Sequence, residues 1–151
     1  MPIDLACRVV RDVAATVALA HERGVIHRDL KPANIFLHRP AFGAPVAKVL
    51  DFGISKVVDA ESTGNTTGTG GMLGTPAYMS PEHAGGRTRV DLRTDVYALG
   101  VILYEMLTGR VPFTGVNSQT IMYAQIHTPP VTSRAAVPSH SLTVPDSRRP
   151  P

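Results

Sequence analysis

Three polar motifs in a fixed order constrain this chain more than any other feature of its sequence. They are HRDLKPAN at residues 27–34, DFG at residues 51–53 and GTPAYMSPE at residues 74–82. Each motif alone carries little information, because a single Asp in a turn is most often a cap. Their order, with a short apolar segment between the first two and a polar loop before the third, is specific. The chain must fold so that these motifs can act together.

An amphipathic helix is predicted before the first motif. Apolar residues recur there at every fourth position, namely Leu5, Val9, Val13 and Val17. This spacing predicts a helix from about Asp4 to Arg23, with Asp4 as its N-cap and Gly24 at its end. Cys7 lies within the pattern, so we expect a buried and unreactive thiol.

A β-hairpin is predicted between the first and second motifs. Residues 35–37 (IFL) and 46–50 (VAKVL) have the composition of short strands, and residues 40–45 between them are rich in turn formers. Residues 62–74 are almost wholly Gly, Thr, Ser and Asn, which predicts a mobile loop.

Two further helices are predicted in the second half of the chain. The first runs from residue 92 or 93 to residue 107 and is apolar nearly all round, so we expect it to be buried. The second begins with Asn117 or Ser118 as N-cap and runs through Ile126, before Pro129 and Pro130. Residues 1–130 are therefore predicted to form one domain. Residues 131–151 form a Pro-rich tail that we expect to be largely disordered.

Composition excludes several classes of protein. The chain has 151 residues, of which 43% are hydrophobic and 18% charged, as expected for a globular chain. Its net charge of +3 comes from scattered residues, so nucleic-acid binding is not expected. One cysteine permits no internal disulfide. The most apolar run, residues 96–107, is too short to span a bilayer, so no membrane segment and a cytoplasmic location are expected.

Taken together, the motifs resemble the catalytic loop, metal loop and activation segment of a protein kinase. Lys31 and Thr75 resemble the residues that Ser/Thr kinases, rather than Tyr kinases, have at these motif positions. Residues 96–113 resemble the central C-lobe helix, and the segment after it, of bacterial eukaryotic-like Ser/Thr kinases. The resemblance implies an α+β, mainly α, fold: a kinase C-lobe with a short β-hairpin at the cleft. It also implies phosphoryl transfer from ATP, with Mg²⁺, to Ser or Thr of a protein substrate.

The resemblance implies a role for each motif residue. Asp29 looks like the catalytic base and Lys31 like the side chain that reaches the γ-phosphate. Asn34 and Asp51 look like the metal ligands, in keeping with the preference of Mg²⁺ for oxygen donors. The remaining implied positions are Phe36 in the floor of the adenine pocket, Thr75 in the substrate loop, and the structural residues His27, Arg28, Phe52, Gly53, Glu82 and Asp95.

Within this structural set, His27 and Phe52 resemble members of a packed hydrophobic column that Asp95 anchors. Arg28 resembles the arginine that pairs with a phosphate on the activation loop. The candidate acceptors of that phosphate are Thr66, Thr67 and Thr69.

The sequence also departs from the family pattern. No glycine-rich phosphate loop and no strand Lys precede His27, so the N-lobe is expected to be missing. The chain is then expected to be inactive alone, unless another chain supplies that lobe. In the family, Glu82 pairs with an Arg after a further helix that is not recognisable here, and Arg148-Arg149-Pro150 is only a weak match. Without this partner, Glu82 is expected to be a buried, uncompensated charge.

Two other functions compete with a kinase. The first is a non-catalytic interaction module, derived from a kinase, that binds proteins through Thr75 and the helix after Asn117. The intact set of Asp29, Asn34 and Asp51 favours an enzyme, because binding alone needs none of the three. The second is a small-molecule phosphotransferase, which is disfavoured because it explains neither Lys31 nor residues 74–82.

Overall fold

The computed structural model describes residues 1–52, 76–86 and 91–132 of the chain. The described part is mainly helical, with one two-stranded antiparallel sheet, which confirms the predicted fold class at this level. In chain order the elements are α1 (Ile3–His21), the 3₁₀ turn η1 (Pro32–Asn34), β1 (Ile35–His38), β2 (Val46–Val49), the 3₁₀ turn η2 (Pro76–Tyr78), α3 (Pro81–Ala84), α4 (Arg93–Thr108) and α5 (Ser118–His127).

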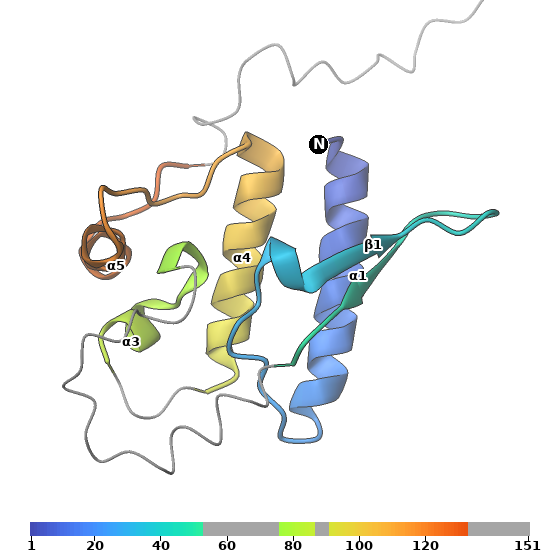
Figure 1. Ribbon diagram of the computed structural model, residues 1–151, viewed down its shortest axis with the longest axis horizontal. Coiled ribbons are helices and arrows are strands. Elements are labelled where there is room, and N and C mark those ends of the chain that lie inside the picture. The colour runs from blue at the N-terminus through green and yellow to red at the C-terminus, as the bar shows by residue number, and fades with distance from the viewer. Residues whose placement is uncertain (53–75, 87–90, 133–151) are drawn as a thin grey trace, which may run out of the picture.

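The helix α4 runs through the middle of the described structure. The helix α1 and the hairpin lie to one side of it, and α3 and α5 lie to the other (Figure 1). The turn η2 contacts both α4 and α5 and so links the central helix to the side that holds α3 and α5. No helix in the described ranges is long and apolar enough to cross a membrane.

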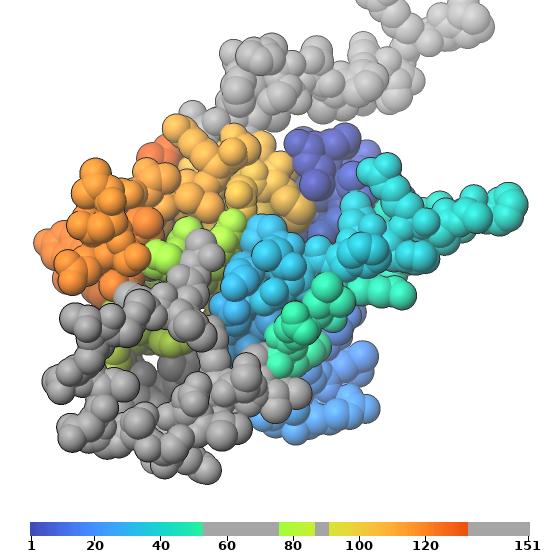
Figure 2. Space-filling model, viewed as in Figure 1, coloured from blue at the N-terminus to red at the C-terminus, as the bar shows by residue number. Residues whose placement is uncertain are grey.

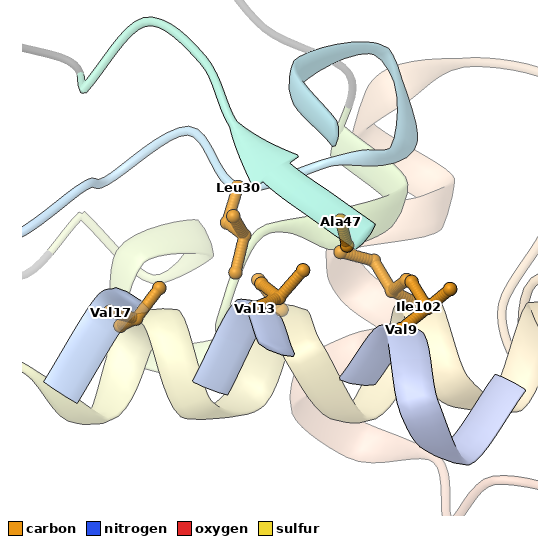
Figure 3. Packing of buried hydrophobic residues seen from close by; sticks show 7 residues of the cluster. Val9, Val13, Val17, Leu30, Ala47 and Ile102 are labelled. Carbon is orange, nitrogen blue, oxygen red and sulfur yellow. The ribbon is translucent and has the colours of Figure 1, made fainter. Parts of the chain in front are cut away.

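The hydrophobic core lies between α1, α4 and the hairpin. Val9, Val13 and Val17 project from α1 toward Leu30 of the first motif and Ala47 of β2 (Figure 3). The other contributions come from Ala98 and Ile102 of α4. Complete burial of a Val, Leu or Ile side chain stabilises a fold by about 1.5–3 kcal/mol. This core therefore fixes the segment that carries the first motif.

Two details of the predicted first helix are wrong. Pro2, not Asp4, is the N-cap residue; Asp4 lies in the first turn, where its charge still complements the helix dipole. The helix ends at His21, and Gly24 follows with a left-handed φ of 73°. The side chain of Cys7 is exposed because Ala6 occupies the buried position of that turn. The prediction of a buried thiol is thus also wrong.

The two later helices are largely as predicted. Asn117 caps α5, accepting a hydrogen bond from the Thr120 backbone N–H at 2.8 Å. In α4, Ala98 and Ile102 are buried, but Val96 is 59% exposed. The prediction that α4 is buried on all sides is therefore wrong for the described structure.

The hairpin is present with the predicted antiparallel pairing, in which Ile35 faces Val49 and His38 faces Val46. Its loop extends away from the rest of the described structure (Figure 2). The side chain of Phe42 in this loop is exposed. The antiparallel pairing returns the chain to the first motif, so the register of the hairpin determines which residues of the first two motifs become neighbours.

Candidate active site

Asp95 of α4 anchors the backbone of the first motif. Its Oδ2 accepts a hydrogen bond from the His27 backbone N–H at 2.8 Å, and its Oδ1 accepts one from Arg28 at 2.9 Å. The His21 Nε2 atom at the end of α1 lies 2.8 Å from the same Oδ2. Asp95 is only 1% exposed, and these donors compensate the loss of hydration of its charge.

This anchoring holds Arg28 in an unusual backbone conformation. Arg28 has a φ of 64°, a left-handed value that is uncommon for a residue other than glycine. Such conformations persist where surrounding contacts hold them, and they cluster at functional sites. The Arg28 Nε atom is buried and has no hydrogen-bond partner in the described structure.

His27 connects the first motif to the second. Its ring is fully buried; Nδ1 accepts a hydrogen bond from the Asp29 backbone N–H at 3.3 Å, and Nε2 lies 3.1 Å from the Leu50 carbonyl oxygen. These contacts fit a neutral ring that carries its proton on Nε2. The ring also packs against Phe52, with centroids 4.9 Å apart. The contact expected between His27 and Phe52 is therefore present.

Asp29, Lys31 and Asn34 come together at the start of the hairpin. The Lys31 Nζ atom donates to Asp29 Oδ2 at 2.9 Å, and both side chains are partly exposed. The Asn34 side-chain amide donates to the Asp29 carbonyl oxygen at 2.8 Å. This arrangement orients the Asp29 carboxylate through Lys31 and leaves the carbonyl oxygen of the Asn34 amide as a possible ligand.

The hairpin brings Asp51 back beside Asn34. The Leu50 backbone N–H donates to the Asn34 carbonyl oxygen at 2.8 Å, which extends the pairing by one residue beyond β1 and β2. Asp51 follows with a φ of 49° and an exposed side chain. The described residues contain no cluster of three or more His, Cys, Asp or Glu that could hold a metal. An Asp and an Asn side chain nevertheless fit Mg²⁺, which takes oxygen donors and completes its shell with phosphate and water.

Of the other predicted site residues, the structure describes some, and the rest lie outside the described ranges. Phe36 lies on β1, on the opposite face from the core, and is 53% exposed. Glu82 lies in the first turn of α3 and is only partly buried. The expected full burial of its charge is therefore wrong, and the weakly matching Arg148-Arg149-Pro150 lies outside the described residues. Outside the described residues lie Gly53, Thr66, Thr67, Thr69 and Thr75, together with the predicted mobile loop of residues 62–74.

The third motif contains contacts that the sequence did not predict. Ser80 caps the short helix α3, and its hydroxyl lies 2.8 Å from the buried hydroxyl of Thr94. The Tyr78 hydroxyl donates to Glu105 Oε2 at 2.6 Å. Burial, followed by this bond to a carboxylate, raises the pKa of Tyr78 well above its usual range. Nothing in the sequence could have paired these residues, because the partners lie far apart along the chain.

The comparisons with known proteins agree with this arrangement. Residues 1–148 match the model of the protein kinase domain. Serine/threonine-protein kinase Pkn1 of Myxococcus xanthus is 50% identical over 124 residues, which cover 81% of this chain and 17% of Pkn1. Serine/threonine-protein kinase PknB of Mycobacterium tuberculosis is 41% identical over 126 residues, covering 83% of this chain and 19% of PknB.

The chain therefore belongs to the protein kinase family. Its bacterial relatives are serine/threonine kinases, and both the motifs and these relatives support a serine/threonine protein kinase. The chain spans less than a fifth of the length of these two relatives, at 17% and 19%.

Proposed function

We propose that this chain carries the phosphoryl-transfer centre of a serine/threonine protein kinase. The observation that best supports this proposal is the cluster of Asp29, Lys31 and Asn34. Lys31 Nζ lies 2.9 Å from Asp29 Oδ2, and the Asn34 side-chain amide donates a hydrogen bond to the Asp29 carbonyl oxygen at 2.8 Å. The hairpin register supports a part for Asp51, because the residue before it, Leu50, bonds to the Asn34 carbonyl oxygen. An acid, a cation and two oxygen ligands are the groups that this chemistry requires.

In the proposed reaction, the hydroxyl oxygen of a substrate Ser or Thr attacks the γ-phosphorus of ATP. The bond from that phosphorus to the bridging oxygen breaks, ADP leaves with the electron pair, and the hydroxyl proton passes to Asp29. Lys31 neutralises charge on the transferred phosphoryl group. Asn34 and Asp51 would hold Mg²⁺, which supplies charge neutralisation on the phosphates.

Lys31 also has a role before ATP binds. Its bond to Asp29 keeps the carboxylate in one orientation, so the base does not need to be reoriented when the substrate arrives. Both side chains keep solvent contact, with 22% and 26% of their surface exposed. The pair is therefore weak enough for Lys31 to turn toward a phosphate.

We further propose that residues 1–130 form a kinase C-lobe, with residues 131–151 as a separate tail. A polypeptide of residues 1–151 alone should transfer phosphate very slowly, since no glycine-rich phosphate loop and no strand Lys precede His27 in its sequence. Loss of one preorganised donor costs a factor of about 10²–10³ in rate. A glycine-rich lobe supplied in the same chain or by another would restore transfer.

The test is a fusion of the Pkn1 segment that precedes the matched region to residues 1–151. Transfer of labelled phosphate from ATP and Mg²⁺ to myelin basic protein is measured for the fusion and for residues 1–151 alone. We expect transfer by the fusion and a loss of at least about 10²-fold in Asp29→Asn and in Asp51→Asn. Asp91→Asn is the matched control, because Asp91 lies on the exposed surface and pairs only with Arg93 in the described structure.

The outcomes separate the competing functions. A folded fusion that transfers nothing would refute the kinase proposal and favour a non-catalytic interaction module. Equal rates for Asp29→Asn and the unaltered fusion would refute the role of Asp29 as base.

A further inference from the structure

The turn η2 is held by side chains from two different helices. On one side, the Tyr78 hydroxyl donates to Glu105 Oε2 of α4 at 2.6 Å. On the other side, Gln125 Nε2 of α5 donates to the Pro76 carbonyl oxygen at 2.7 Å. The same carbonyl oxygen accepts the Met79 backbone N–H at 3.1 Å, which closes the turn. Pro76 directly follows Thr75 in the sequence.

Gln125 reaches η2 from a well-anchored helix. Asn117 caps α5, and α5 packs against α3. The packing is close at Gly85, the residue that ends α3: a methyl group added there would lie 3.9 Å from Ile126 Cδ1 of α5. The Gln125 side chain is only 5% exposed. A donor locked by packing on a helix holds its acceptor more firmly than one on a loop.

The two ends of the Gln125 amide differ in their surroundings. Nε2 bonds to Pro76, whereas Oε1 is buried and has no hydrogen-bond partner in the described structure. An unpaired buried acceptor is unfavourable, and an apolar side chain of similar size would avoid its cost. Such a side chain could not donate to Pro76. The bond from Nε2 is therefore the contribution that distinguishes Gln125 from an apolar residue.

We infer that Gln125 is a positioning residue for the segment that binds the protein substrate. It fixes the Pro76 carbonyl, and through it the turn that continues from Thr75. This inference rests on the proposed function, which makes the third motif the substrate loop. Its consequence is selective: loss of the Gln125 donor should weaken use of the protein substrate and leave the use of ATP unchanged.

The first experiment measures the turn directly in residues 1–151. Hydrogen exchange of the segment 76–79 is followed in the unaltered chain and in Gln125→Met, which keeps the size of the side chain and removes the amide. We expect exchange about tenfold faster in this segment, because the Pro76 carbonyl loses its side-chain donor. Exchange in α4 should not change, because the variant also removes the unpaired Oε1 and so does not lower the stability of the whole fold. Gln119→Met, at an exposed position of the same helix, is the matched control.

The second experiment measures function in the fusion with the Pkn1 segment. We expect Gln125→Met to raise the KM for myelin basic protein about tenfold, the equivalent of one lost hydrogen bond. The KM for ATP should not change. Gln125→Glu places a carboxylate oxygen opposite the Pro76 carbonyl and should show the same selective effect, whereas Gln119→Glu should show none.

Each result supports or overturns the inference. Equal exchange at residues 76–79, or equal increases in the KM for ATP and for protein, would overturn it. So would faster exchange without any change in the KM for protein. If the unaltered fusion transfers no phosphate, the proposed function fails instead, and that failure is recognised without any Gln125 variant.

Discussion

Replacement of Asp95 by Asn tests the anchoring of the first motif. The carboxylate receives two contacts at Oδ2, from the His27 N–H and the His21 ring, and one at Oδ1, from the Arg28 N–H, all at 2.8–2.9 Å. Asn offers one acceptor oxygen. In its best orientation this oxygen keeps the two contacts at Oδ2, and the NH₂ group then faces the Arg28 N–H, donor against donor.

The expected cost follows from that geometry. A hydrogen bond to a charged group contributes about 1.5–3 kcal/mol, and an unpaired buried donor costs about 1–3 kcal/mol. The remaining two bonds become neutral and weaker. We therefore expect Asp95→Asn to lower the free energy of unfolding by about 3 kcal/mol, a large part of the 5–15 kcal/mol typical of a domain.

Urea unfolding followed by circular dichroism measures this loss. With an m-value of about 2 kcal/mol/M, the midpoint should fall by about 1.5 M. Asp91→Asn is the control: Asp91 accepts the Arg93 backbone N–H at the start of α4, the side-chain oxygen of Asn can accept the same bond, and the ion pair of Asp91 with Arg93 is exposed. If the two variants differ by less than about 0.5 kcal/mol, Asp95 does not anchor the motif as argued.

Three further predictions rest on other contacts. Tyr78→Phe should lower the free energy of unfolding by about 1.5–3 kcal/mol because Glu105 loses its partner. The raised pKa of Tyr78 favours the folded state up to the unfolded pKa near 10, and the benefit declines at higher pH. Alkaline stability curves should therefore fall less steeply in Tyr78→Phe, and parallel curves would contradict this. Gly100→Ala should raise the melting temperature, stabilising α4 by about 0.5–1 kcal/mol, since among the described residues the new methyl group would have no neighbour within 4 Å beyond the adjacent residues and backbone of α4 itself; a lower melting temperature would contradict this. Cys7 should react with a maleimide in the folded chain as fast as in urea, and protection in the folded chain would show that α1 is covered.

Local patterns were enough to predict most of the described elements. Apolar spacing located α1, strand-forming composition on either side of a turn-rich segment located the hairpin, and Asn117 marked the start of α5. The same patterns failed where burial depends on neighbours. Cys7 and Val96 belong to apolar runs, yet both are exposed, because a helix buries only the face that another element covers.

By itself, the sequence determined the family: the order of the three motifs predicted a protein kinase, and the segment between the first two motifs predicted the hairpin that joins them. Only the tertiary structure decided what holds these motifs. The contacts of Asp95 with the first motif, of Tyr78 with Glu105 and of Gln125 with Pro76 join residues that lie far apart in the chain. Such bonds leave no local pattern, because their geometry exists only after α1, α4 and α5 have packed.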